Sequence, residues 1–230
     1  MGSPLRSRLD MDSRRAQLLE LGLRLFGTRA YDEVSIDDIA QAANISKGLL
    51  YHYFGGKRAF YVAVVSDAAR RLVAAIDPDP HLPPPARALA GLDAYLAFVE
   101  QRADAYAALV TGGLGADPKI AAVLERARQQ IADHILADLG LRFPRPAYRL
   151  ALRAWIGGVE AACVDWLRRR DLPRDRLLAL MLGSLQGALA SAHAIDPVDL
   201  SVPVPRLVDP GPQGSAPDDP VPDDSVPDER

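Results

Sequence analysis

The sequence predicts an all-α protein. Apolar residues recur at helical spacing along most of the chain, no segment shows the alternation typical of a strand, and breaks rich in glycine or proline separate the helical segments. With 230 residues, 49% of them hydrophobic, the chain can form one or two domains with a real core. We expect nine helices, divided into a small N-terminal group with a helix-turn-helix and a larger C-terminal bundle.

The first helix is expected to begin at Asp12-Ser13, whose side chains can accept hydrogen bonds from the free N–H groups of a helix start. Gly27 would end this helix. Residues 1–11 contain two arginines and are expected to form a flexible basic arm. The apolar positions of the helix lie on one face; they are Ala16, Leu19, Leu23 and Phe26.

Two short helices are predicted next. Ser35 and Asp38 resemble a capping box, in which two side chains satisfy N–H groups at the start of a helix. Apolar residues from Ile36 to Ala43 then lie on one face of the first of these helices. Asn44 tolerates the left-handed backbone that a tight corner often needs, and Ser46 can cap the following helix. This spacing of two helices and a turn is the helix-turn-helix pattern.

The second helix of this pair has a buried and an exposed side. Leu50 and Phe54 should face the core, and Gly55-Gly56 should end the helix. The residues left for the surface are Lys47, Gly48, Leu49, Tyr51, His52 and Tyr53. Such residues suit a DNA groove, because glycine permits close approach, leucine can contact a thymine methyl group, and tyrosine hydroxyls can donate to phosphates. A single tyrosine would more simply pack on a neighbouring helix, but the combination favours a nucleic-acid surface.

A fourth helix is expected from Lys57 to Ile76, with a lysine and free N–H groups at its start that can bind a phosphate. The stretch DPDPHLPPPA marks a domain boundary. Residues 12–76 would form a DNA-binding domain, connected mainly through the fourth helix and its contact with the first to a bundle of residues 77–194. The predicted bundle helices are Ala86–Gln101, Ala103–Thr111, Pro118–Leu139, Ala147–Arg170 and Asp175–Ala194.

The last two predicted helices are unusually apolar. No charged residue occurs between Arg176 and Asp196, and a membrane-spanning helix needs roughly 20 apolar residues. Polar side chains interrupt this segment, so we favour a helix that contacts its own core on one side and a second copy of the chain on the other. Gly183 and Gly187 would permit the close approach of that second copy.

The charge of the chain is unevenly distributed. Residues 195–230 contain nine acidic residues and two arginines, a net charge of −7, which leaves +4 for the remainder of a chain whose total is −3. This proline- and aspartate-rich tail cannot bury apolar surface and is expected to be disordered. The mildly basic remainder is compatible with a polyanionic partner.

The helix-turn-helix region resembles the DNA-binding domain of the TetR family of bacterial transcriptional regulators. The segments SIDDIA (residues 35–40) and ANISKGLLYHYF (residues 43–54), followed by Lys57, carry the resemblance. Two departures are Asn44, where the family usually has glycine, and Leu49, often a polar residue in the family. The resemblance implies a nine-helix TetR-like homodimer, with the last two helices paired between subunits and a small effector bound in the bundle.

Site residues follow from the same resemblance by position. It implies phosphate contacts from Ser35, Ser46, Tyr51, Tyr53 and Lys57, and a groove-facing set of Lys47, Gly48, Leu49 and His52. In the bundle, large or polar side chains indicate a mainly apolar or aromatic effector with few polar anchors. These candidate effector contacts are Tyr95, Phe98, Tyr106, His134, Trp155 and Trp166. The resulting hypothesis is a repressor that an effector releases from a palindromic operator.

Two alternatives belong to other classes. An enzyme is not indicated, because the four histidines fall in different segments without metal-ligand spacing, and Cys163 lies among apolar neighbours. A non-specific architectural DNA binder would need neither a large bundle nor an acidic tail. We therefore expect no cofactor and no metal, a DNA operator and a second subunit as partners, and, without a signal peptide, a cytoplasmic location.

Overall fold

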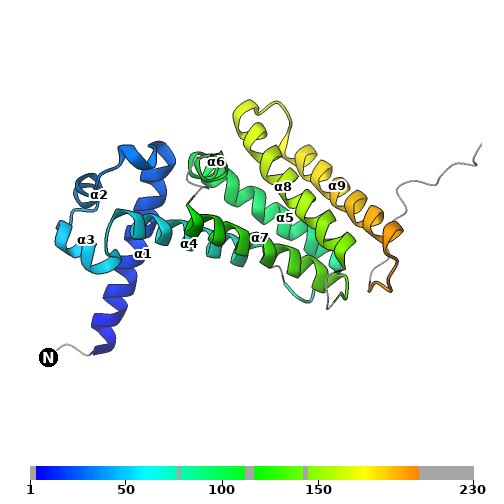
Figure 1. The fold of residues 1–230 in the computed structure, drawn as a ribbon, viewed down its shortest axis with the longest axis horizontal. Helices are drawn as coiled ribbons and strands as arrows, with labels where there is room; N and C mark the ends of the chain where they lie inside the picture. Colours follow the sequence, from blue (N-terminus) through cyan, green and yellow to red (C-terminus); the bar gives the residue numbers. More distant parts are fainter. Residues whose placement is uncertain (1–3, 77–78, 112–116, 142–144, 202–230) are drawn as a thin grey trace, which may run out of the picture.

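The computed structural model describes residues 4–76, 79–111, 117–141 and 145–201, and in these ranges it contains nine α-helices, one short 3₁₀ helix and no strand. The molecule is elongated, with α1, α2, α3 and the start of α4 at one end and α5 to α9 at the other (Figure 1). We call residues 4–75 the head and α5 to α9 the bundle. The predicted all-helical fold is confirmed.

Helix bounds agree with the sequence-based expectations to within two residues, except at the N-terminus. The helices of the head are α1 (Pro4–Thr28), α2 (Ile36–Ala42), α3 (Lys47–Phe54) and α4 (Lys57–Ala75), with the 3₁₀ helix at Tyr31–Glu33. The helices of the bundle are α5 (Pro84–Gln101), α6 (Ala103–Thr111), α7 (Pro118–Asp138), α8 (Pro146–Arg169) and α9 (Arg174–Ile195).

The first helix begins earlier than predicted. It starts at Pro4 rather than at Asp12-Ser13, so the expected basic arm is helical from its fourth residue onward. Proline is well accommodated in the first turn of a helix, where its missing N–H group is not needed. The residues between Pro4 and Asp12 contain no further proline or glycine, so nothing in them opposes continuation of the helix.

The turn between α2 and α3 has the predicted local chemistry. The Ser35 hydroxyl accepts a hydrogen bond from the Asp38 N–H group at 3.0 Å, and the Asp38 carboxylate accepts one from the Ser35 N–H group at 2.8 Å. Asn44 has a φ of 51°, which is the left-handed region, and the Ser46 hydroxyl caps α3 by accepting from the Leu49 N–H group at 3.1 Å. Gly55, with a φ of 77°, ends α3.

The core of the head continues into the bundle. Buried side chains from α1 to α4 form one hydrophobic cluster with Ala105 of α6 and with Ile120 and Val123 of α7. A Cβ atom added at Gly27 would lie 2.9 Å from the Ala105 backbone nitrogen, so α1 and α6 approach each other closely. Head and bundle are therefore joined by contacts of α1 with α6 and of α4 with α7. The expected connection through α4 is present, but the expectation omitted the direct contact of α1 with α6.

The beginning of the expected acidic tail is also part of the bundle. Ile195 is the last residue of α9, and Val198 and Leu200 pack against the core formed by α7, α8 and α9. The Ser201 N–H group donates to the Leu139 carbonyl at 3.0 Å. These apolar side chains complete a core. The proline- and aspartate-rich composition of residues 195–230 as a whole did not indicate this packing. Residues 202–230 of the expected tail lie outside the described residues.

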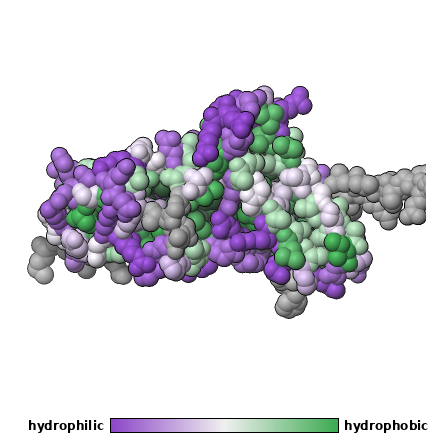
Figure 2. Space-filling model, turned by 45° about the horizontal axis from the view of Figure 1, so that its top comes forward, coloured by the Kyte–Doolittle hydropathy of each residue, from purple (hydrophilic) through white to green (hydrophobic). Residues whose placement is uncertain are grey.

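The last helix leaves one apolar side uncovered. By length and composition α9 could cross a membrane, a test that core helices of soluble proteins also pass, yet only 22% of its most apolar stretch is buried within the chain. Leu150 of α8 and Leu180 of α9 are 56% and 62% exposed. Figure 2 shows hydrophobic surface gathering over the bundle, while the head surface is mostly hydrophilic.

The close packing of α1 on α4 generates a prediction at Gly22. A Cβ atom there would lie 2.5 Å from Val64 Cγ2 and 2.7 Å from Phe60 Cζ, and both side chains are almost fully buried and cannot retreat. We expect Gly22→Ala to lower the free energy of unfolding by about 1–3 kcal/mol through overpacking. The matched control is Gly48→Ala, where the nearest atom is 3.9 Å away. Urea denaturation that finds the two variants equally stable would contradict this packing.

Candidate nucleic-acid interface and effector cavity

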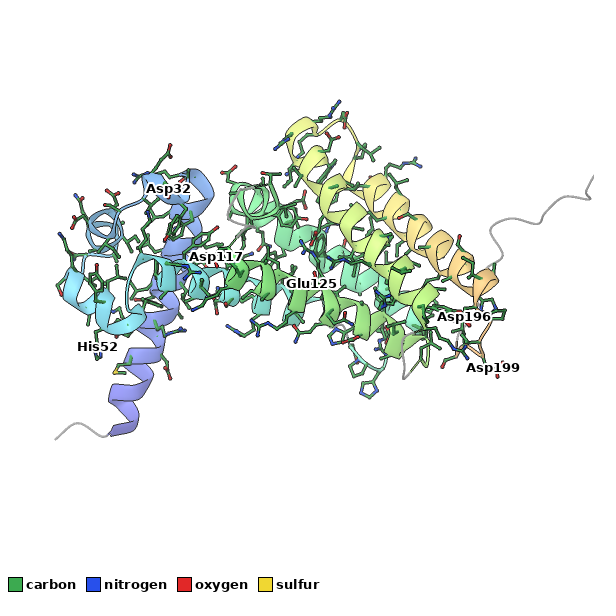
Figure 3. All side chains as sticks on the ribbon, viewed as in Figure 1. Asp32, His52, Asp117, Glu125, Asp196 and Asp199 are labelled. Carbon is green, nitrogen blue, oxygen red and sulfur yellow. The ribbon has the colours of Figure 1, made fainter. Side chains whose placement is uncertain are left out.

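The surface of α3 is separated from its core side as the sequence predicts. Leu50 is fully buried and Phe54 is 9% exposed, whereas Tyr51 is 51% and Leu49 37% exposed. Lys47, Gly48 and His52 are also exposed. His52 projects from the head away from the rest of the molecule (Figure 3). The four groove-facing candidates and Tyr51 thus lie exposed on one short helix.

Gly48 is not required by packing within the chain. An added Cβ atom would meet only the Ser46 hydroxyl, at 3.9 Å. Its φ does not lie in the left-handed region that favours glycine. The absence of a side chain therefore leaves the α3 backbone open to a partner outside the chain, which is consistent with its predicted approach to base edges.

Lys47 forms an ion pair with Asp37 of α2, and the two side chains are 60% and 64% exposed. An ion pair this exposed contributes little to stability, because water screens both charges. The pair holds the ammonium group beside the α2–α3 turn and can be exchanged for a contact with a phosphate or a base edge. Sequence analysis predicted the lysine's role but not this intramolecular partner.

Ser35 and Ser46 can each form two hydrogen bonds through the side-chain hydroxyl group. The oxygen atoms of Ser35 and Ser46 accept the capping hydrogen bonds of α2 and α3. A hydroxyl group also has one O–H donor, which capping leaves unused. Each serine can therefore cap its helix and donate to a phosphate at the same time, and both side chains are exposed.

Tyr53 and Lys57 are more constrained than Tyr51. The Tyr53 ring is half-buried and packs against the core of the head. The Lys57 ammonium lies 4.2 Å from the centroid of the Tyr31 ring, a cation–π contact that positions it at the start of α4. Both remain candidate phosphate contacts, with their positions set by the core beneath them.

An ion pair that sequence analysis missed connects the head to the bundle. The Arg58 guanidinium, one residue after Lys57, donates two hydrogen bonds to Asp117, at 2.7 and 3.0 Å. Asp117 also caps α7 by accepting from the Lys119 N–H group at 2.9 Å. These interactions, the Arg58 hydrogen bonds above all, lower the pKa of Asp117 to about 2. Figure 3 shows Asp117 at the junction between head and bundle.

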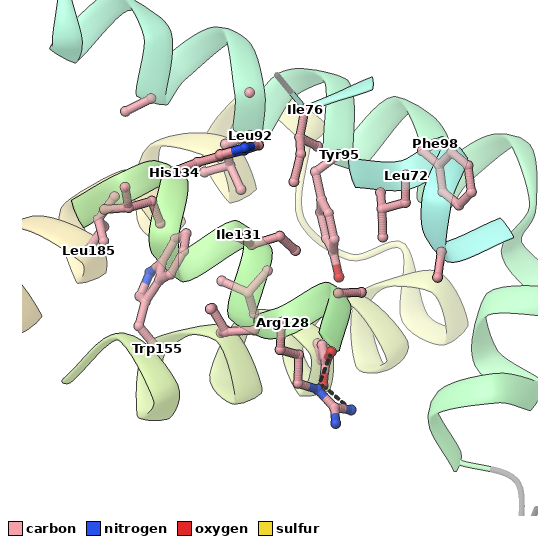
Figure 4. A pocket seen from close by; sticks show the side chains of 18 of the residues that line it. Leu72, Ile76, Leu92, Tyr95, Phe98, Arg128, Ile131, His134, Trp155 and Leu185 are labelled. Carbon is pink, nitrogen blue, oxygen red and sulfur yellow. Dashed lines mark hydrogen bonds and ion pairs between the residues drawn. The ribbon is translucent and has the colours of Figure 1, made fainter. Parts of the chain in front are cut away.

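A cavity of about 440 Å³ lies between α4 and the bundle. Residues of α4 to α9 and Leu23 of α1 line it, and most of its wall is aliphatic. Five of the six candidate effector residues contribute to the wall: Tyr95, Phe98, Tyr106, His134 and Trp155. Figure 4 labels Tyr95, Phe98, His134 and Trp155. Trp166 does not, because its indole is buried in the neighbouring core and donates to the Leu172 carbonyl at 2.7 Å. That candidate is better explained as a structural residue.

The polar groups of the cavity wall are mostly paired with one another. The hydroxyl groups of Tyr95 and Tyr106 are 2.6 Å apart, and burial raises the pKa of both, so they remain neutral. Arg128 forms a bidentate pair with Glu160 at 2.9 and 3.0 Å, drawn with dashed lines in Figure 4. The wall also contains Arg87. Neither Arg87 nor Arg128 was predicted from the sequence, because the sequence does not distinguish an exposed arginine from one that lines a cavity.

The fourth helix reaches both candidate sites. Its first residue is Lys57 in the head, and its later turns together with its C-cap contribute five residues to the cavity wall. These wall residues are Val65, Ala68, Ala69, Leu72 and Ile76. A molecule in the cavity therefore contacts the same helix that presents Lys57 beside α3.

Neither metal chemistry nor a reactive thiol is indicated by the described residues. Among them no group of three or more histidine, cysteine, aspartate or glutamate side chains could hold a metal ion. Burial raises the pKa of the Cys163 thiol to about 12, so it stays protonated and packs as a small apolar residue.

Comparison with known proteins agrees with this arrangement in both halves of the chain. Residues 18–64 match a family model described as bacterial regulatory proteins, tetR family. Residues 84–186 match a model described as a tetracyclin repressor-like C-terminal domain.

Relatives resemble the chain over most of its length. The crystal structure of a tetR-family transcriptional regulator from Streptomyces coelicolor is 33% identical, covers 85% of each chain and superimposes with a TM-score of 0.72. The transcriptional activator FasR of Mycolicibacterium smegmatis is 28% identical over 74% of this chain and 79% of its own. The transcriptional repressor DhaR of Mycobacterium sp. strain GP1 is 27% identical over 76% of this chain and 80% of its own.

The junction pair generates a pH-dependent prediction. Because the pKa of Asp117 is lowered from 3.8 to about 2, its contribution to stability is present above pH 3.8 and is lost as the pH falls toward 2. Thermal melts of Asp117→Asn and the unaltered protein should therefore differ at neutral pH and converge in acid. Asp165→Asn is the control, because Asp165 and its partner Arg169 are both more than 60% exposed. A difference that grows in acid would contradict the role of Asp117.

Proposed function

The chain belongs to the TetR family of bacterial transcriptional regulators, which bind DNA and are not enzymes, and we propose that it is a repressor released from its operator by a small, mainly apolar effector. The observation that carries the proposal is the course of α4, which begins beside α3 and then forms part of the cavity wall. A regulator of this kind acts on the chromosome, in the cytoplasm.

The proposed mechanism is a shift between two conformations. An effector lowers DNA affinity only if it binds the non-DNA-binding conformation more tightly than the other. Filling the cavity would press on Leu72 and neighbouring residues of α4 and move its start relative to the bundle. In a dimer this changes the separation of the two α3 helices, which must match about one DNA turn, 34–36 Å, or a multiple of it.

Repression is the simpler direction of control for this architecture. A bound repressor acts by occupying DNA, for which the head, α4 and the cavity suffice. Activation would need an additional contact with the transcription machinery, and the name of the relative FasR makes activation the second candidate. A reporter gene behind the operator distinguishes the two, because deleting the regulator raises expression under repression and lowers it under activation.

The proposed assembly is a homodimer built on α8 and α9. These helices pack side by side within one chain and leave Leu150 and Leu180 exposed on their outer side. Glycines on the same side have open space, since a Cβ atom at Gly157, Gly158 or Gly183 would meet nothing within 4 Å. A second copy would cover this apolar surface, and its two-fold symmetry would require a palindromic operator.

The proposed roles of α3 residues predict unequal mutational effects. Tyr51→Phe removes a phosphate donor, so it should weaken binding to every duplex by a similar factor, about two- to tenfold. Leu49→Ala should instead change base preference at one position in each half-site. Selection from random duplexes followed by quantitative band shifts measures both. Tyr148→Phe, whose hydroxyl bonds His193 in the bundle, is the control and should bind DNA normally.

If Leu49→Ala selects the same half-site as the unaltered protein, Leu49 does not read a base. If Tyr51→Phe changes the selected sequence rather than the overall affinity, Tyr51 contacts a base and not a phosphate.

The dimer surface predicts the effect of a bulky charge. Gly183→Arg should leave the single chain folded, because the position is exposed and open, but should separate the subunits and abolish operator binding. Gly183→Ala, with its small side chain, should remain dimeric. Native mass spectrometry and circular dichroism report assembly and folding separately. A dimer of normal stability in the arginine variant would place the interface elsewhere.

A further inference from the structure

The shape of the cavity restricts its occupant to an elongated molecule. Wall residues on α5 extend from Pro84 to Phe98, and those on α7 from Leu124 to Asp138. Each pair is 14 positions apart, or about 21 Å along a helix. A spherical cavity of about 440 Å³ would be only about 9 Å across. The space is therefore a narrow channel along two helices, with Phe98 on one side and Trp155 and Leu185 on the other in Figure 4.

The charges along this channel are not balanced. Two of its arginines have carboxylate partners in the wall, as Arg87 pairs with Asp138 and Arg128 with Glu160. Arg102, at the junction of α5 and α6, forms no ion pair with any described residue. The wall thus holds three cations and two anions, and Arg102 is the uncompensated one.

The Arg102 side chain is positioned but incompletely satisfied. Its guanidinium carbon lies 4.4 Å from the centroid of the Phe98 ring, and Nη1 donates to the Gln101 side chain at 3.2 Å. Its Nε is buried and has no hydrogen-bond partner among the described residues. Buried N–H groups are normally paired, and a guanidinium edge with a free Nε matches a planar carboxylate.

We propose that the cavity binds a single-chain amphiphile, with the apolar chain along α5 and α7 and a terminal carboxylate on Arg102. The inference rests on the proposed function, because it names the chemical class of the effector. Stacking on Phe98 holds the guanidinium in place, and the aliphatic wall excludes water from the chain. The Nε of Arg87 is also buried without a hydrogen-bond partner among the described residues, but Asp138 and Glu160 neutralise the charges of Arg87 and Arg128, so Arg102 is the wall arginine without a carboxylate partner.

The test compares tetradecanoate with methyl tetradecanoate and tetradecanol, which have the same chain and no charge, by calorimetric titration of the full-length protein below micelle-forming concentrations. Tetradecanoate should bind at least about tenfold more tightly than either neutral probe, since a charge-assisted hydrogen bond is lost in both. Arg102→Gln should remove this preference and Arg102→Lys should retain part of it. Arg170→Gln is the matched control, because Arg170 also stacks on an aromatic ring, that of Trp166, but lies outside the cavity.

Equal affinity for the carboxylate and the neutral probes would overturn the proposal, as would a preference that survives in Arg102→Gln or disappears in Arg87→Gln. Naphthoate, a compact aromatic carboxylate, tests the inferred shape of the cavity. If naphthoate binds as tightly as tetradecanoate, the inference of an elongated channel is wrong. Band shifts with the selected operator separate this inference from the proposed function. If tetradecanoate binds through Arg102 but does not release DNA, the ligand class is supported and induction is refuted. If another compound releases DNA and no carboxylate binds, induction is supported and the ligand class is refuted.

Discussion

The close approach of α1 to α4 and α6 is the constraint on which the rest of the structure depends. It is possible because glycines occupy both crossings, Gly22 against Val64 and Phe60, and Gly27 against the backbone of Ala105. The head consequently shares its hydrophobic core with α6 and α7. The head alone could not bury its apolar side chains as well, because small domains bury a smaller fraction of their surface.

This shared core has a consequence for how the two ends of the molecule communicate. Packed interiors resist continuous deformation, so a displacement of α4 must be accommodated by its neighbours α1 and α7 as well. The Arg58–Asp117 pair lies at this same contact and joins the first turn of α4 to the cap of α7. Any movement of the head relative to the bundle must preserve or break this pair, together with the apolar contacts around Ile120 and Val123.

The surfaces proposed to bind other molecules differ from this core in their exposure and in their residue types. On α3 the exposed residues lie on a helix whose ends are determined by caps, so the directions of their side chains are fixed while the side chains remain accessible to a partner. On the outer side of α8 and α9, Leu150 and Leu180 are exposed and Gly157, Gly158 and Gly183 have open space beside them, which suits a close protein contact. The cavity combines an aliphatic wall with one arginine, Arg102, that forms no ion pair with a described residue. Each surface thus corresponds to a proposed partner of different chemistry: DNA, a second copy of the chain and an amphiphile.

The sequence by itself determined those structural features that depend only on residues close together in the chain. The capping box at Ser35, the left-handed corner at Asn44 and the division of α3 into Leu50 and Phe54 against Leu49 and Tyr51 all follow from local spacing. Helical periodicity shows which side of a helix is apolar, but not which helix covers it. Only the tertiary structure paired α1 with α6, placed Asp117 opposite Arg58 across 59 positions of the chain, and assigned Trp166 to a core while leaving Arg102 at the cavity. These outcomes depend on contacts between distant segments, whose geometry no local pattern contains.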